Sequence, residues 1–171
     1  MRNARRPRWM GLAAALLLSS ALGSHAADLV PEARYAGIAP AGSRVDLSQI
    51  GTNNRATVDQ SGTRQRLVQV QSGTANIASI SQSGNYNAAI AQQSGYGNVL
   101  DLTQSGYNNQ AAVVQAGTAN QANVVQSGAY NQAYVGQYGQ GNQANVSQNG
   151  FGGTVIVNQY GNNMNATVTQ Q

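Results

Sequence analysis

The chain contains no cysteine, no lysine and a single histidine, His25, near its N-terminus. Without cysteine it can form neither disulfides nor thiolate metal sites. Its acidic residues are too few for a paired-carboxylate site, and they do not recur as the oxygen ligands of a calcium-binding β-roll would. We therefore expect no catalysis, and no cofactor, bound metal or small-molecule substrate.

The first 26 residues are typical of a secretory signal peptide. Four arginines precede an apolar run over residues 10–22, which is too short for a membrane span, and the small residues that follow predict cleavage between Ala26 and Ala27. Removal of residues 1–26 leaves five arginines and five acidic residues, so the remaining chain is neutral. A neutral chain lacks the positive charge that supplies most nonspecific affinity for nucleic acids, which argues against that class of partner. We expect secretion through the Sec pathway.

From residue 49 onward the sequence repeats every eleven residues. Twelve glutamines, from Gln49 to Gln170, mark the repeat; each of the first eleven is followed by glycine two residues later and, in eight of the eleven units, by asparagine five residues later. The positions seven and nine residues later are apolar, with Gln69 as the one exception. The repeated carboxamides, which we interpret as candidate assembly residues, are Gln49, Asn54, Gln60, Gln71, Asn76, Gln82, Asn87, Gln93, Asn98, Gln104, Asn109, Gln115, Asn120, Gln126, Asn131, Gln137, Asn142, Gln148, Gln159 and Gln170. The repeated glycines, which we interpret as turn residues, are Gly51, Gly62, Gly73, Gly84, Gly95, Gly106, Gly117, Gly128, Gly139, Gly150 and Gly161.

The spacing within one unit predicts a strand and a turn. Asn, Ala, Val and Gln fall at alternate positions, so they share the inward face of a strand of roughly six or seven residues. The glycine that follows is expected in a tight turn with positive φ. Two units then face each other across a thin core, which predicts an all-β fold, a parallel two-sheet β-solenoid with about 22 residues per coil, over residues 49–171. The spacing of Leu67 and Leu100 favours a three-sided coil of about 33 residues instead, but alanine and valine are too small to fill such an interior.

Stacked coils place identical carboxamides about 4.7–4.8 Å apart, where each amide can donate to one neighbouring copy and accept from the other. Without these partners each buried amide would cost about 1–3 kcal/mol. The sequence stops in mid-pattern at residues 167–171, so we expect an exposed strand edge that can template another copy.

The unit Gln-x-Gly-x-x-Asn-x-Ala-x-Val-x-Gln over residues 49–171 resembles the curlin repeat of curli fibre subunits. The resemblance implies a structural subunit of an extracellular, cell-surface amyloid fibre that supports adhesion and biofilm formation. It also implies three kinds of partner: a second curlin subunit, the outer-membrane curli secretion pore and accessory assembly factors. The basic residues around Gln65, and Met164 in the last unit, are similar to features of the minor curlin, which nucleates polymerisation of the major one. The major, shaft-forming subunit is the alternative.

Residues 27–48 contain Pro31 and Pro40 and lack the repeat, so we interpret them as a flexible leader. The resemblance links such a leader to recognition by the secretion pore, and an inert linker is the alternative. A different class of function is a monomeric β-solenoid that binds a surface, as an adhesive or ice-binding protein does. Such a protein would carry a regular outward face, whereas the positions eight residues after each glutamine are irregular, and we therefore favour assembly. These positions include Thr57, Ser79, Ile90, Asp101, Asn123 and Tyr134.

Overall fold

The computed structural model describes residues 42–171, which form twelve strands. The expected signal peptide, with its cleavage site, and residues 27–41 of the expected leader lie outside the described residues. The strands are β1 (Arg44–Thr52), β2 (Arg55–Thr63), β3 (Arg66–Thr74), β4 (Ile77–Asn85), β5 (Ala88–Tyr96), β6 (Val99–Tyr107), β7 (Gln110–Thr118), β8 (Gln121–Ala129), β9 (Gln132–Gln140), β10 (Gln143–Phe151), β11 (Thr154–Asn162) and β12 (Asn165–Gln170). Within residues 42–171 no helix is long and apolar enough to cross a membrane.

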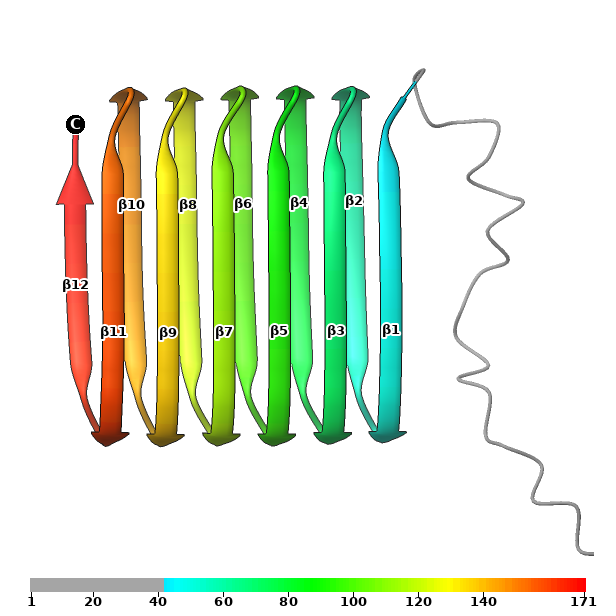
Figure 1. Cartoon of the computed structure of the whole chain (residues 1–171), viewed down its shortest axis with the longest axis vertical. Coiled ribbons are helices and arrows are strands. Elements are labelled where there is room, and N and C mark those ends of the chain that lie inside the picture. The colour runs from blue at the N-terminus through cyan, green and yellow to red at the C-terminus, as the bar shows by residue number, and fades with distance from the viewer. Residues whose placement is uncertain (1–41) are drawn as a thin grey trace, which may run out of the picture.

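The chain alternates between two layers as it runs from β1, at the right of Figure 1, to β12, at the left. Odd-numbered strands form one six-stranded sheet, the odd sheet, and even-numbered strands form another, the even sheet. Neighbouring strands are parallel, and each residue pairs with the residue one coil later, as Gln71 does with Gln93 and Gln82 with Gln104. One coil is therefore an odd strand, a turn, an even strand and a second turn. The prediction of a parallel two-sheet β-solenoid is confirmed, with the same 22-residue coil throughout.

The strands begin earlier and run longer than the sequence pattern predicted. β1 begins at Arg44 and not at Gln49, because Val45 and Leu47 already occupy the two apolar positions that precede a repeated glutamine, here Gln49. Residues 44–48 of the expected leader therefore belong to the first coil. Full strands have nine residues, since pairing continues through the glycine to the residue after it. Twelve strands at two per coil give six coils.

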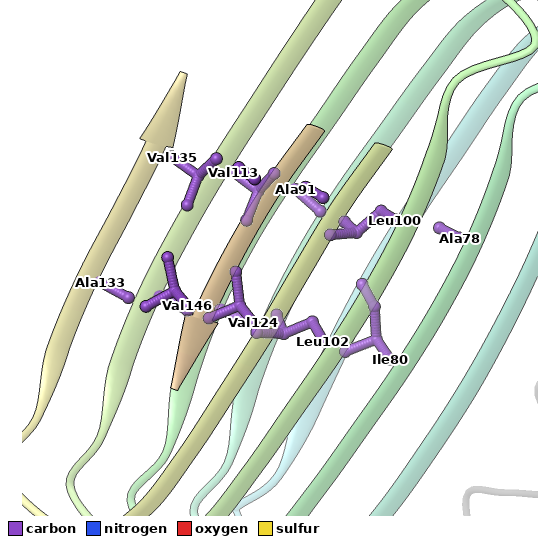
Figure 2. Packing of buried hydrophobic residues seen from close by; sticks show 14 of the residues in the cluster. Ala78, Ile80, Ala91, Leu100, Leu102, Val113, Val124, Ala133, Val135 and Val146 are labelled. Carbon is purple, nitrogen blue, oxygen red and sulfur yellow. The ribbon is translucent and has the colours of Figure 1, made fainter. Parts of the chain in front are cut away.

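Small aliphatic side chains fill the space between the two sheets. The two inward positions before the repeated glutamine carry an aliphatic residue in every strand, most often alanine or valine, except at Gln69, and from β3 to β11 these aliphatic side chains are buried. Figure 2 shows them as two facing rows, with Val113 in one row and Val124 in the other. Leu67 lies in the odd sheet and Leu100 in the even sheet, so their spacing does not stack them in one column. Such short side chains suit a core of two walls rather than three.

Two columns of residues at each turn require positive φ. The repeated glycines have positive φ, and they also approach the next coil so closely that a Cβ on Gly117 would lie 2.0 Å from the carbonyl oxygen of Gly139. The first residue of each two-residue turn has positive φ as well, although most of these residues are not glycine. Ala75, Ala119 and Tyr130 are examples, with φ of 57°, 53° and 60°. The sequence pattern predicted the first column and missed the second.

We expect Ala119→Gly to stabilise the solenoid and Gly117→Ala to destabilise it. The left-handed conformation costs an L-residue about 1–2 kcal/mol, of which the greater flexibility of unfolded glycine cancels about 0.5–1 kcal/mol. Ala119→Gly should therefore gain up to about 1.5 kcal/mol, whereas Gly117→Ala should lose at least about 1–3 kcal/mol from backbone strain before any clash. Urea denaturation followed by circular dichroism measures both, and a gain of stability in Gly117→Ala would contradict the close approach.

Candidate functional site

Two ladders of glutamine side chains run along the inside of the solenoid, one in each sheet. In both, the Nε2 of one glutamine donates to the Oε1 of the glutamine one coil later, over distances of 2.5–3.1 Å. The odd ladder contains Gln49, Gln71, Gln93, Gln115, Gln137 and Gln159, and the even ladder contains Gln60, Gln82, Gln104, Gln126, Gln148 and Gln170. Every bond points from the N-terminal coil toward the C-terminal coil, so each ladder has a direction.

Most interior glutamines also bond across the core to the opposite sheet. The Nε2 of Gln71 in β3 donates to the carbonyl of Arg55 in β2 at 3.0 Å, and that of Gln115 in β7 donates to Val99 in β6 at 2.9 Å. Six further glutamines make the equivalent bond. One carboxamide therefore fixes both the stacking within its sheet and the spacing between the sheets.

The ladder glutamines lie in an environment where an unpaired amide would be costly. From Gln71 to Gln159 they are at most 2% exposed, whereas Gln49, Gln60 and Gln170 at the two ends are half-buried. A buried polar group without a partner costs about 1–3 kcal/mol, which the small aliphatic core is poorly able to offset. The glutamines at the ends are the ones that another coil would cover.

The asparagine column closes the turns and forms an amide ladder only in part. The Nδ2 of Asn98 donates to the carbonyl of Ser94, near the end of the preceding strand β5, and to that of Gly117 in the next coil, at 3.0 and 3.2 Å. Its Oδ1 accepts from the backbone N–H of Asn120. Bonds between asparagine side chains join Asn54, Asn76, Asn98 and Asn120. The asparagine side chain is one methylene shorter than glutamine, and its amide lies beside the turn carbonyls, so it bonds mainly to backbone.

Two glutamines, one in β3 and one in the turn before it, replace consensus residues and leave buried atoms unpaired. Gln69 in β3 occupies the valine position, where it lies between Leu47 and Ala91 and is 1% exposed. Among the described residues, neither its Nε2 nor its Oε1 has a partner. Gln65 occupies the asparagine position, and its Nε2 donates to the carbonyls of Ser61 and Gly84, but its Oε1 is unpaired. The ladder chemistry therefore depends on position and not on residue type alone.

We expect Gln115→Leu to lower stability and Gln69→Val to raise it, although both remove a buried glutamine amide. Gln115→Leu leaves an N–H of Gln93, the Oε1 of Gln137 and the carbonyl of Val99 without this partner, so the loss should be at least about 2 kcal/mol. Gln69→Val removes two unpaired atoms at nearly constant volume and should gain about 1–3 kcal/mol. Urea denaturation measures both.

Gln110→Leu, on the solvent-exposed side of β7, is the matched control and should change stability by less than about 0.5 kcal/mol. Equal losses in Gln115→Leu and Gln69→Val would mean that the ladder bonds do not decide the outcome.

Aromatic rings form a second column along the turns that lead from even to odd strands. Tyr86, Tyr107, Tyr130 and Phe151 follow one another with ring centroids 5.2–5.5 Å apart, and the guanidinium of Arg64 lies over the ring of Tyr86. The pKa of Tyr107 is raised, first by the electrostatic effect of Tyr130 and then by desolvation. Each ring pair contributes about 0.5–1.5 kcal/mol, so this column supports the stacking from outside the core.

The charged residues of the first coils contribute little to the candidate site. The Nε of Arg44 bonds Asp46 at 2.7 Å on the outer surface, and this hydrogen bond, more than the charge itself, lowers the pKa of Asp46. Their side chains are 71% and 41% exposed, and solvent-screened pairs of this kind add little stability. Within residues 42–171 no group of three or more histidine, cysteine or acidic residues could hold a metal ion.

One stretch of the solenoid, which includes β8, β9 and most of β10, is similar to a known protein family. Residues 117–150 match the family model described as the curlin associated repeat. No curated protein matches the chain. The matched stretch is a minor part of the 171 residues, but the ladder bonds and register of this curlin-like stretch recur from β1 to β12. The same local geometry therefore extends along the whole described solenoid.

Proposed function

We propose that this chain is a structural subunit of an extracellular amyloid fibre of the curli type, in which copies stack end to end. The observation that carries the proposal is the pair of buried glutamine ladders, whose bonds all run in one direction. The match of residues 117–150 to the curlin associated repeat supports it. A parallel cross-β stack is also the arrangement in which identical side chains pair best with copies of themselves.

The two ends of the described solenoid are complementary to each other. The direction of the odd ladder leaves an acceptor, Oε1, on Gln49 and a donor, Nε2–H, on Gln159, and the even ladder does the same at Gln60 and Gln170. Within residues 42–171, β1 and β2 are edge strands at one end and β11 and β12 at the other. A second copy in the same orientation would continue both ladders and both sheets, whereas an inverted copy would oppose donor to donor.

Within the fibre we propose the minor, nucleating role for this subunit. Arg64 and Arg66 around Gln65, and Met164 in the asparagine position, resemble features of a minor curlin. Charged side chains at exposed strand positions slow aggregation, and along the outward face of β4–β12 only Asp101 could act in this way. The basic residues lie near the first coils rather than near the C-terminus, unlike those expected of a minor subunit. The proposal therefore concerns nucleation and not the mode of surface attachment.

The proposed route to the fibre follows from the same resemblance. The chain is exported by its signal peptide through the Sec pathway and then passes the curli secretion pore with the help of accessory factors. The leader ahead of β1 carries the recognition by the pore. Its partners are further copies of itself and a major curlin.

We expect the purified protein to form fibres that bind thioflavin T and diffract at about 4.7–4.8 Å along the fibre axis, the cross-β spacing. The physical reason is that each junction pairs two edge strands and both ladder ends. X-ray fibre diffraction and electron microscopy check this. A stable soluble monomer at micromolar concentration would contradict the proposal and favour a monomeric binding solenoid.

We expect preformed fibres of this protein to shorten the lag of a major curlin, because the exposed ladder ends offer a ready template. The measurement is thioflavin T kinetics with and without seeds at equal mass. Fibres of an unrelated amyloid, which lack glutamine ladders in this register, are the control and should leave the lag unchanged. An unchanged lag with both seeds would support the shaft-forming role instead.

A further inference from the structure

The outward faces of the two sheets have different chemistry. The residue three positions before each ladder glutamine lies at the centre of the outward face, and in each sheet these residues stack directly on one another. In the odd sheet they are Asp46, Val68, Ile90, Ala112, Tyr134 and Ile156. In the even sheet they are Thr57, Ser79, Asp101, Asn123, Asn145 and Thr167. At this position the odd sheet therefore presents a continuous column of apolar and aromatic side chains, Val68 to Ile156, and the even sheet presents a column of polar ones; elsewhere on the even face Ile77 and Val125 are also exposed.

The apolar column is exposed, and its surroundings are also largely uncharged. Ile90 and Ile156 are 56% and 65% exposed, and four residues further along the same strands as Tyr134 and Ile156 the rings of Tyr138 and Tyr160 stack with centroids 5.0 Å apart. The outward positions of β5, β7, β9 and β11 carry no charged side chain. Contiguous exposed apolar surface of this kind usually marks an interaction site.

We propose that the outward face of the odd sheet binds the same face of a second copy, so that two stacks lie side by side in the fibre. The inference rests on the proposed function, because it concerns stacks of this chain. Six strands of nine residues make a face of about 29 by 30 Å, or roughly 850 Å², at ordinary strand spacing and rise. A stable interface buries about 800 Å² on each partner, so one face per chain is large enough.

The spacing of the apolar column identifies a second copy as the occupant. Its side chains recur once per rung, and another cross-β stack of this chain has the same rung spacing, so the two columns can interdigitate along their whole length. A two-fold axis parallel to the stacking direction brings the faces together with both stacks pointing the same way, which is a closed, self-complementary contact. The charges of the odd face lie only on β1 and β3, so the four strands β5, β7, β9 and β11 can pair with their copies without opposing charges.

The test compares charge placed on the two faces at matched positions. Ile90→Lys with Ile156→Lys alters the odd face, and Ser79→Lys with Thr167→Lys alters the same column positions of the even face. Fibres assembled from the purified protein are weighed by scanning transmission electron microscopy as mass per length. Six coils rise about 28 Å, so the unaltered protein and the even-face variant should give two chains per 28 Å. The odd-face variant should give one, with cross-β diffraction retained.

A mass of one chain per rise of about 28 Å in the unaltered protein, or of two chains over the same rise in the odd-face variant, would overturn the lateral contact. Either result would leave the end-to-end stack intact. An equal reduction in both variants overturns it too, since it would show an effect of charge and not of the face. If the unaltered protein formed no fibres, the proposed function would fail and this inference with it. Should the lysine variant fail to assemble, Ile90→Asn with Ile156→Asn repeats the test with the residue that the even face carries at Asn123 and Asn145.

Discussion

The structure depends on one requirement, that a buried glutamine amide must lie directly over another glutamine amide. A strand shifted by one residue would turn the glutamines outward, and a shift by two would place them opposite the valine position or the glycine. Only the registers in which Gln71 meets Gln93, and so on along the column, satisfy every amide. Because the second amide proton of Gln71 reaches the carbonyl of Arg55 in the other sheet, the same group also limits the distance between the walls. The thin alanine and valine core is a consequence of that distance.

The glycine and asparagine columns act together at the turns that join the strands of each coil. A Cβ on Gly51 would lie 1.9 Å from the carbonyl oxygen of Gly73, and that oxygen accepts a bond of 3.0 Å from the Nδ2 of Asn54. Glycine thus leaves room for a carbonyl that points toward the preceding coil, and asparagine supplies its donor. Where Met164 replaces asparagine, its backbone N–H still donates to the Oδ1 of Asn142 below it. The turn therefore tolerates the loss of an asparagine amide better than it would tolerate a Cβ on the glycine.

Much of the fold could be predicted from the sequence because the inward residues alternate and repeat without interruption. The start of β1 could not, because the pattern was anchored on Gln49 and the preceding unit shows only Val45 and Leu47. The positive φ at Ala119 could not be predicted either. Glycine is the usual sign of a left-handed residue, and here the chain adopts that strained conformation at an alanine. The partners of the asparagines were missed because side-chain reach, and not residue spacing, decides between a neighbouring amide and a turn carbonyl.

Irregularity at period eleven also concealed the difference between the two outer surfaces. Consecutive units belong to opposite sheets, so Ser79 and Ile90 are neighbours in the repeat but face opposite sides of the molecule. Read at period 22, the outward residues three positions before the ladder glutamines separate into a largely apolar column on the odd sheet and a polar column on the even sheet. The inward residues obey the shorter period because both walls need the same amides, whereas the outward residues are free of that requirement. Selection can therefore change one surface of the solenoid without disturbing the ladders that hold it together.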